Sequence, residues 1–284
     1  MKNLGFGLQL YSVREALAKD EKATVEAVAQ MGYQEVELCA PDFENGRPAP
    51  VLTPAQTREL YGGLGLRLLS IAMAVDLHPT MEEWQRLVEY SAEIGCEAVC
   101  CSVATFADRG AVLQHADFFN RVARFAAEHG QKFFYHNHYH EFQRFQGETA
   151  LDLLVQNTDP ALVDFELDTF WALRGGVDPL AYMDKLGERL KLVHQKDLSA
   201  DVHPVNLFEK IPEGTVIDWD TFGLYANGPE AFRELGRGAM DVPAILAKAK
   251  AMTGVYSIIV EQDHSAIGEL ESARINYVYL RERL

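Results

Sequence analysis

Short apolar segments alternate with amphipathic segments of helical periodicity from one end of the chain to the other. Several of the apolar segments, such as residues 98–102, 191–194 and 257–261, are apolar almost throughout rather than at every second position. Near-continuous apolar runs of this length are typical of parallel strands whose two faces are both covered by helices. The alternation therefore predicts an α/β fold built on a parallel sheet.

Eight strand–helix pairs account for nearly all of the chain. The predicted strands comprise residues 4–11, 35–38, 66–75, 98–102, 133–136, 163–168, 191–194 and 257–261. The predicted helices comprise residues 21–31, a helix from Pro54, residues 80–94 and 111–129, helices from Thr149 and from Pro179, and residues 242–252 and 269–283. Thr53 before Pro54, and Thr80 with Glu83 as a capping box, are typical helix starts.

Eight such pairs in 284 residues match the usual size of one (β/α)₈ barrel. A doubly wound open sheet would also alternate strands and helices, but it usually has a glycine-rich phosphate turn after its first strand. Residues 8–15 contain no glycine. We therefore predict an α/β fold of the (β/α)₈ TIM-barrel type, with a single domain over residues 1–284 and a long loop after the seventh strand.

The long loop, about residues 197–240, shows no clear regular element in the sequence. Structureless connections longer than about 15 residues are usually functional. This loop contains Trp219, Phe222 and Tyr225, and it ends in the glycine-containing sequence ELGRG at residues 234–238. We interpret it as a cover of the active site or as a contact in a homo-oligomer.

The chain has 42 acidic and 26 basic residues, a formal net charge of −16, and no run rich in lysine and arginine. Nucleic-acid binders normally present a basic surface to phosphates, so we expect no nucleic-acid partner. No apolar run reaches the length of a membrane span and no signal-peptide pattern is visible, so we expect a cytoplasmic protein without a membrane partner. The four cysteines form no C-x-x-C pattern, and we expect them to be buried and reduced.

Polar and ionisable residues follow the ends of the predicted strands, most densely after strands five to eight. In a TIM barrel the carboxyl ends of all strands meet at one face, where the active site lies. The residues at these positions are Gln9, Tyr11, Glu37, Asp76, His78, Ser102, His136, Asn137, His138, Glu141, Glu166, Asp168, His194, Lys196, Asp197, Glu261 and Asp263. Charged residues placed at random would not gather at the exits of apolar strands, so the pattern predicts a functional site.

Carboxylates combined with imidazole nitrogens are typical ligands of a catalytic divalent cation. One such group from each of four successive strands could surround a single ion. The predicted metal ligands are Glu141, Asp168, His194 and Glu261.

Each predicted ligand has a structural alternative. Asp168 could cap the turn that follows it, His194 could be a buried core histidine, and Glu261 could pair with a barrel lysine. Glu141 lies several residues beyond its strand and could belong to the loop surface. His136 and His138 compete for its place in the site.

In six places the sequence resembles the sugar phosphate isomerase/epimerase family of xylose-isomerase-like TIM barrels. The matching segments are GLQLYSVR at 7–14, HNHYHEF at 136–142, ELDTFW at 166–171 with GVDP at 176–179, HQKD at 194–197, ELGRG at 234–238 and VEQD at 260–263. They occur in order from the first strand to the last and cover essentially the whole chain. The resemblance implies a Glu–Asp–His–Glu site for one Mn²⁺, Zn²⁺, Co²⁺ or Mg²⁺ ion. It also implies isomerisation or epimerisation of a ketose or keto-sugar.

One of these segments departs from the family pattern. Many epimerase relatives carry the first glutamate at the end of strand five in a Glu-Pro-x-Asn segment, whereas this chain has His136-Asn-His138 there. The identity of the first ligand and of the acid–base pair is therefore left open. Histidines at this place also fit relatives that dehydrate inososes or act on 3-keto-glycosides. A metal-dependent endonuclease of the same superfamily would need further ligands and a basic face, and the net charge argues against it.

We expect an isomerase or epimerase that binds a small sugar and transfers a proton through an enediolate, which the ion stabilises as a Lewis acid. Glu141, His136 or His138 would remove the proton and Glu261 would return it. The residues predicted to contact the sugar are His138, Lys196, Trp171 and Gln9. Two alternatives stay open. One is a metal-dependent dehydratase or lyase acting on an inosose or a 3-keto-glycoside, and the other is a non-catalytic barrel that binds a sugar or a protein.

Overall fold

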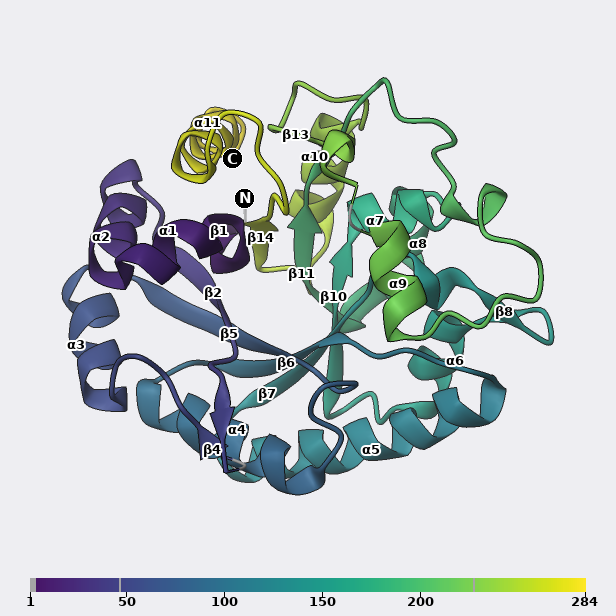
Figure 1. Ribbon diagram of the computed structural model, residues 1–284, viewed down its shortest axis with the longest axis horizontal. Helices are drawn as coiled ribbons and strands as arrows, with labels where there is room; N and C mark the ends of the chain where they lie inside the picture. Colours follow the sequence, from purple (N-terminus) through teal and green to yellow (C-terminus); the bar gives the residue numbers. More distant parts are fainter. Residues whose placement is uncertain (1–3, 46, 227) are drawn as a thin grey trace.

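Eight parallel strands close into a barrel in the computed structural model of the chain, which describes residues 4–45, 47–226 and 228–284 (Figure 1). Neighbouring strands in the barrel follow one another along the chain, and the last strand pairs with the first. The bounds are β1 Gly5–Gln9, β2 Glu35–Cys39, β5 Arg67–Ala74, β6 Ala98–Val103, β7 Lys132–His136, β10 Val163–Asp168, β11 Leu190–Gln195 and β14 Ser257–Val260. This topology confirms the predicted TIM barrel in a single domain.

Helices surround the barrel on the outside (Figure 1). Their bounds are α1 Arg14–Lys19, α2 Glu21–Met31, α3 Pro54–Gly63, α4 Met81–Ile94, α5 Arg109–Glu128, α6 Ala150–Asn157, α7 Thr169–Arg174, α8 Pro179–Leu186, α10 Val242–Ala251 and α11 Glu269–Arg281. The predicted capping box at Thr80 is present, and the predicted cap Thr53 also forms a capping box, with Gln56. Each supplies hydrogen-bond partners for backbone groups that have none within the helix.

The loops at the strand ends carry short additional elements. Antiparallel pairs join β3 Phe43–Glu44 to β4 Arg47–Pro48, β8 Arg144–Phe145 to β9 Glu148–Thr149, and β12 Asp197–Leu198 to β13 Phe232–Arg233. The 3₁₀ turns are η1 Leu10–Val13, η2 His140–Phe142, η3 Gly187–Arg189, η4 Leu207–Glu209 and η5 Pro229–Ala231. The turn η1 directly follows β1, and η2 lies in the segment just after β7, so both influence where polar side chains leave the barrel.

The loop after β11 contains a helix that the sequence did not predict. This helix, α9 Trp219–Ala226, lies over the open face of the barrel (Figure 1). It was missed because it has only eight residues, includes Gly223 and several aromatic side chains of modest helix propensity, and so shows no sustained periodicity. The backbone amide of Thr221 donates to the Asp218 carboxylate near the start of α9, as in other helix caps.

A single carboxylate fixes both ends of the long loop. Asp197 accepts hydrogen bonds from the backbone amides of Leu198, Gly236, Gly238 and Met240, at 2.9–3.1 Å. A Cβ atom on Gly238 would lie 2.3 Å from Oδ1 of Asp197, so only glycine fits there. The ELGRG segment is therefore held next to the end of β11 by hydrogen bonds that do not involve the residues between them.

Two further expectations can be compared with the fold. In the part of the chain that the structure describes, the helices are too short or too polar to cross a bilayer. The four cysteines are free thiols, and Cys96, Cys100 and Cys101 are buried as expected. Cys39 is exposed instead, because it is the last residue of β2 and lies at the open end of the barrel.

Candidate active site

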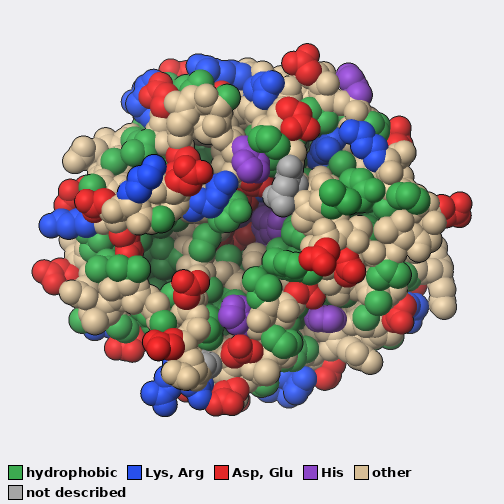
Figure 2. Space-filling view, viewed as in Figure 1, with side chains coloured by type: hydrophobic (Ala, Val, Ile, Leu, Met, Phe, Trp, Pro, Cys, Tyr) green, Lys and Arg blue, Asp and Glu red, His purple; other side chains and the backbone are tan. Residues whose placement is uncertain are grey.

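A cavity of about 540 Å³ opens at the carboxyl ends of the barrel strands, a size typical of small-molecule sites. Figure 2 shows it as a hollow near the centre of this face, with histidine and acidic side chains at its bottom. Its polar lining includes Gln9, His136, His138, Glu166, His194, Glu261 and Asp263. Its apolar lining includes Phe43, Met73, Leu77, Trp171, Trp219 and Phe222.

Four nitrogen and oxygen donors converge on one side of this cavity. His136, Asp168, His194 and Glu261 each offer an atom that lies within 4.8 Å of the other three. His136 and Asp168 are the last residues of β7 and β10. His194 is the last residue but one of β11, and Glu261 directly follows β14. These four strands are neighbours in the barrel, which explains why the donors meet. We refer to these residues as the donor group.

The structure does not bring Glu141 to the donor group. Its carboxylate accepts hydrogen bonds from the hydroxyl of Tyr135 at 2.8 Å and the backbone amide of His138 at 2.9 Å, and it lies 3.3 Å from His140. Glu141 is fully buried in η2 and does not line the cavity, and burial raises its pKa to about 8. Glu141 thus braces the turn after β7, while His136 takes the fourth position in the donor group.

Lys196 lies between the two carboxylates of the donor group. Its ammonium donates to Oδ2 of Asp168 and to Oε2 of Glu261, each at 2.5 Å, and lies 3.6 Å from Asp263. Burial opposes the charge on Glu261, but the Lys196 ammonium and His194 outweigh it and hold the pKa of Glu261 well below its usual range. Lys196 is thus the barrel lysine that was considered as a partner of Glu261, and Glu261 pairs with it while also belonging to the donor group.

Two imidazoles and two carboxylates form a donor set that suits a borderline or hard divalent cation, such as Zn²⁺ or Mn²⁺. The two carboxylates need positive charge, since Asp168 is buried, Glu261 is largely buried and Lys196 supplies only one charge. A divalent ion in this group would share oxygens with the ammonium or displace it. The residues present therefore fit a metal ion.

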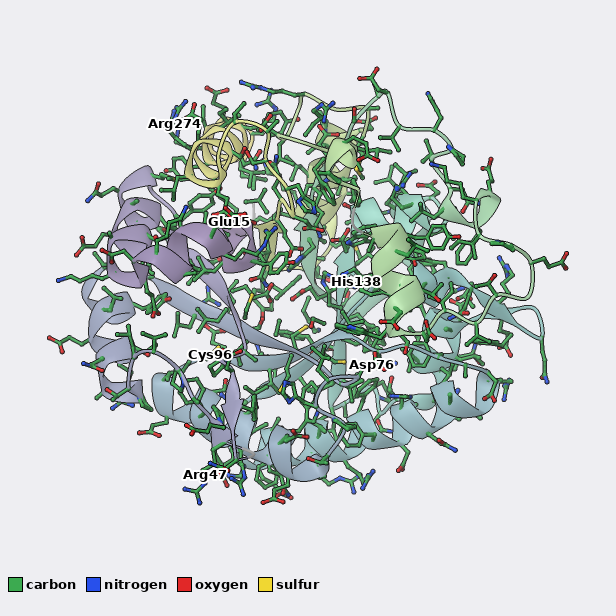
Figure 3. All side chains as sticks on the ribbon, in the orientation of Figure 1. Glu15, Arg47, Asp76, Cys96, His138 and Arg274 are labelled. Carbon is green, nitrogen blue, oxygen red and sulfur yellow. The ribbon has the colours of Figure 1, made fainter. Side chains whose placement is uncertain are left out.

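Two buried nitrogens in the cavity have no hydrogen-bond partner within the protein. They are Nδ1 of His138 and Nε1 of Trp171, and the two rings lie 5.4 Å apart. Buried polar atoms are normally paired, so unpaired ones that face a cavity are suited to binding a ligand. Figure 3 shows His138 near the middle of the barrel beside α9. The sugar-contact roles of His138 and Trp171 stay predictions that this geometry favours.

Gln9 lines the cavity, but its amide is largely occupied within the protein. Its Nε2 donates to Glu37 at 2.9 Å, and its Oε1 accepts from the backbone amide of Tyr11 at 3.1 Å. The predicted contact of Gln9 with a sugar would therefore compete with these bonds. Gln9 is held in place chiefly as a partner of Glu37.

The helix α9 forms one wall of the cavity. Trp219 and Phe222 line it, and the hydroxyl of Tyr139 donates to the backbone carbonyl of Phe222 at 3.2 Å. The ring of Phe222 lies 5.0 Å from that of His138. The loop after β11 therefore occupies the position expected of an active-site cover, and its aromatic side chains narrow the entrance.

Two buried glutamates complete the site without having been assigned a role from the sequence. Glu166 lies two residues before Asp168 on β10 and so on the same face of the strand, and Glu37 lies inside β2. Both contact His194. An acidic residue in the middle of a predicted strand was the available signal, because such a residue is rarely buried without a partner.

Fold and site together define a TIM barrel with a donor group that fits a divalent cation at the carboxyl ends of its strands. The chain belongs to the xylose isomerase-like TIM barrel family, whose model matches residues 25–275. It is 37% identical over 170 residues to an inosose dehydratase of Clostridium beijerinckii, covering 59% of this chain and 53% of that protein. It is 25% identical over 253 residues to an inosose dehydratase of Geobacillus thermodenitrificans, covering 81% and 82%. The alignment to the first of these relatives thus spans about half of its length.

Solved structures share the fold at lower sequence identity. A sugar phosphate isomerase/epimerase from Parabacteroides distasonis superposes with a TM-score of 0.76 at 22% identity, over 99% of this chain and 94% of that one. An IolI protein with a bound zinc atom superposes with a TM-score of 0.70 at 13% identity, over 98% and 97%. These likenesses show that the chain shares its fold with both proteins.

Proposed function

We propose that this chain is a divalent-metal-dependent dehydratase that eliminates water from a cyclic keto-polyol of the inosose type. The observation that carries the proposal is the donor group, in which His136, Asp168, His194 and Glu261 converge and of which all but Asp168 line the cavity. The reaction class is supported by the inosose dehydratases among the relatives.

The first sequence-based expectation, an isomerase or epimerase, is less well supported. The curated relatives matched at 25–37% identity are named dehydratases. The isomerase/epimerase structure from Parabacteroides distasonis is 22% identical and shares the fold alone. Both reactions begin with removal of the proton next to a carbonyl, so the same donor group serves either. The isomerase then returns a proton to a carbon atom, whereas the dehydratase expels the β-hydroxyl as water.

A bound divalent ion would supply Lewis acidity next to the substrate carbonyl, which makes the adjacent C–H acidic. We assign removal of this proton to His138. It lines the cavity and its Nδ1 has no hydrogen-bond partner within the protein, so this nitrogen is available to accept a proton. The C–H electron pair becomes a carbon–carbon double bond as the β-carbon–oxygen bond breaks.

The departing hydroxide needs a proton to leave as water. Asp263 lines the cavity on the side of Glu261, and burial raises its pKa to about 7, so near neutral pH a share of these carboxyls carries a proton. We assign proton donation to Asp263. The apolar wall formed by Trp219 and Phe222 excludes water around the reacting carbons.

The test is a substrate panel of inososes, 3-keto-glucosides and open-chain ketoses, assayed with Mn²⁺, Zn²⁺ and Co²⁺ in D₂O. Dehydratase activity predicts an ultraviolet-absorbing enone that needs metal and is lost in Asp168→Asn. Deuterium appearing in a ketose without enone would favour the isomerase instead. A protein that binds no metal and turns over no member of the panel would favour the non-catalytic barrel.

A further inference from the structure

We propose that Glu166 is a positioning residue that orients both imidazoles of the donor group. The inference rests on the metal site proposed above and concerns how that site is held in shape. Oε1 of Glu166 lies 2.9 Å from Nδ1 of His136 and 2.8 Å from Nε2 of His194. One carboxylate oxygen thus contacts both rings.

The backbone explains this arrangement. His136 ends β7 and pairs in register with Glu166 on β10, and β11 follows on the other side of β10. Glu166 therefore lies between the two histidine-bearing strands. All three side chains are at most 5% exposed, so water does not compete for these contacts.

The contacts decide which nitrogen of each ring is available to an ion. Nδ1 of His136 faces Glu166, which leaves Nε2 available. Nε2 of His194 faces Glu166, which leaves Nδ1, and this nitrogen lies 3.1 Å from Oε2 of Glu261, another member of the donor group. A metal-binding histidine usually donates its second ring N–H to a carboxylate, which fixes the ring and makes the ligating nitrogen more basic.

Glu37 holds His194 from a second direction. Its Oε2 lies 2.6 Å from Nε2 of His194 and accepts from the amide of Gln9 at 2.9 Å, while its Oε1 accepts from the hydroxyl of Ser70. Glu37 is fully buried and does not line the cavity. It does not face a substrate in the cavity, so any effect it has on the reaction passes through His194 or through Gln9.

A rival interpretation places a second cation among the same residues. Glu37, Glu166 and His194 also offer donor atoms within 4.8 Å of one another, and Oε2 of Glu166 has no hydrogen-bond partner. Against this, both oxygens of Glu37 already accept hydrogen bonds. A second ion would also have to take the His194 nitrogen that the two carboxylates share. The two interpretations differ in metal stoichiometry.

The variants are Glu166→Gln and Glu37→Gln, with Glu35→Gln as the matched control. Glu35 lies two residues before Glu37 on the same face of β2 and is also buried, but it bonds to Ser257 and Arg67 and to no member of the donor group. Thermal unfolding and circular dichroism verify that each variant folds. The probes are Zn²⁺ affinity by competition with a chromophoric chelator, the visible spectrum of the Co²⁺-loaded protein, and ¹⁵N NMR of the histidine rings.

We expect Glu166→Gln to weaken Zn²⁺ binding by about 10–100-fold and to alter the Co²⁺ spectrum, with a smaller change in Glu37→Gln and none in Glu35→Gln. The NMR spectrum should show hydrogens on Nδ1 of His136 and Nε2 of His194 in the parent protein, and this pattern should change in Glu166→Gln.

Unchanged affinity and unchanged ring signals in Glu166→Gln would overturn the inference, as would an equal loss in Glu35→Gln. Two bound ions in the parent protein and one in Glu166→Gln would establish the rival second site. If the parent protein binds no ion, the proposed metal dependence fails. The ring signals of the metal-free protein then still decide whether Glu166 orients the two histidines.

Discussion

Replacing Lys196 by methionine should destabilise the protein and at the same time strengthen its hold on a divalent ion. The side chain of Lys196 is 1% exposed, and its ammonium contacts the carboxylates of Asp168 and Glu261, which are 0% and 11% exposed. Methionine keeps much of the volume but removes the charge. The two carboxylates then face each other without a cation between them.

The expected cost follows from the burial of this group. Removing one partner of a buried ion pair typically costs about 3–5 kcal/mol, because the remaining charge stays desolvated. For a chain of this size that corresponds to a fall in the unfolding temperature on the order of 10 °C. An ion that binds only the folded state returns about 2.7 kcal/mol at 100 times its dissociation constant. Added metal should therefore recover much of the loss.

The assay is thermal unfolding in chelator and in excess Zn²⁺, combined with calorimetric titration of the ion. Lys185→Met is the control, since Lys185 also lies 2.5 Å from a carboxylate, that of Asp152, but its side chain is 53% exposed. Loss of the Lys185–Asp152 ion pair should lower the free energy of unfolding by less than about 1 kcal/mol. The dissociation constant for Zn²⁺ should fall about tenfold in Lys196→Met, because the competing ammonium is gone. Weaker Zn²⁺ binding in that variant, or unchanged stability in chelator, would refute the reasoning.

Further predictions concern Glu141, Gly238 and Trp219. Glu141→Gln should bind Zn²⁺ as tightly as the parent chain, whereas Asp168→Asn should lose at least tenfold in a competition titration; equal losses would restore Glu141 as a ligand. Because the folded-state pKa of Glu141 is raised to about 8, its contribution to stability is present below the unfolded pKa and is lost as pH rises through about 8. Urea unfolding between pH 5 and about 9 should therefore show the parent chain losing stability relative to Glu141→Gln, and parallel curves would contradict the raised pKa. Gly238→Ala should cost about 1–3 kcal/mol, since its Cβ would meet Asp197, and unchanged urea unfolding would count against the anchor. Trp219→Ala should raise KM more than it lowers kcat, because this side chain lines the cavity away from the donor group; an effect on kcat alone would speak against a cover.

The barrel could be predicted from the sequence because its signals are local. Buried parallel strands are nearly continuous in apolar residues, and the predicted strand of residues 98–102 lies within β6 Ala98–Val103. The helix predicted near residues 21–31 from its apolar face likewise coincides with α2 Glu21–Met31. In the structure Asp20 caps its start, and Gly32 in the left-handed conformation follows its end.

The assignment within the segment HNHYHEF could not be made from the sequence. Which of His136, His138 and Glu141 faces the cavity depends on the direction of the chain after β7. The 3₁₀ turn η2 sets that direction, and the hydroxyl of Tyr135 stabilises the buried position of Glu141. A turn of three residues is too short to show the hydrophobic periodicity by which helices and strands are predicted from a sequence. The role of Glu166 was missed for another reason, because its two histidine partners lie on other strands and only the closed barrel brings them together.

The anchoring of the long loop by Asp197 makes the cavity wall that the loop forms independent of the strand ends that carry the donor group. The loop leaves the barrel beside Lys196 and returns to the same carboxylate at residues 236–240, so both of its ends are fixed independently of the residues between them. The free energy of closing such a loop changes only slowly with its length. Insertions or exchanges around α9 can therefore reshape the cavity wall without moving His194 or Lys196. If the proposed function holds, changes in this loop would alter which substrates fit the cavity while leaving the donor group in place.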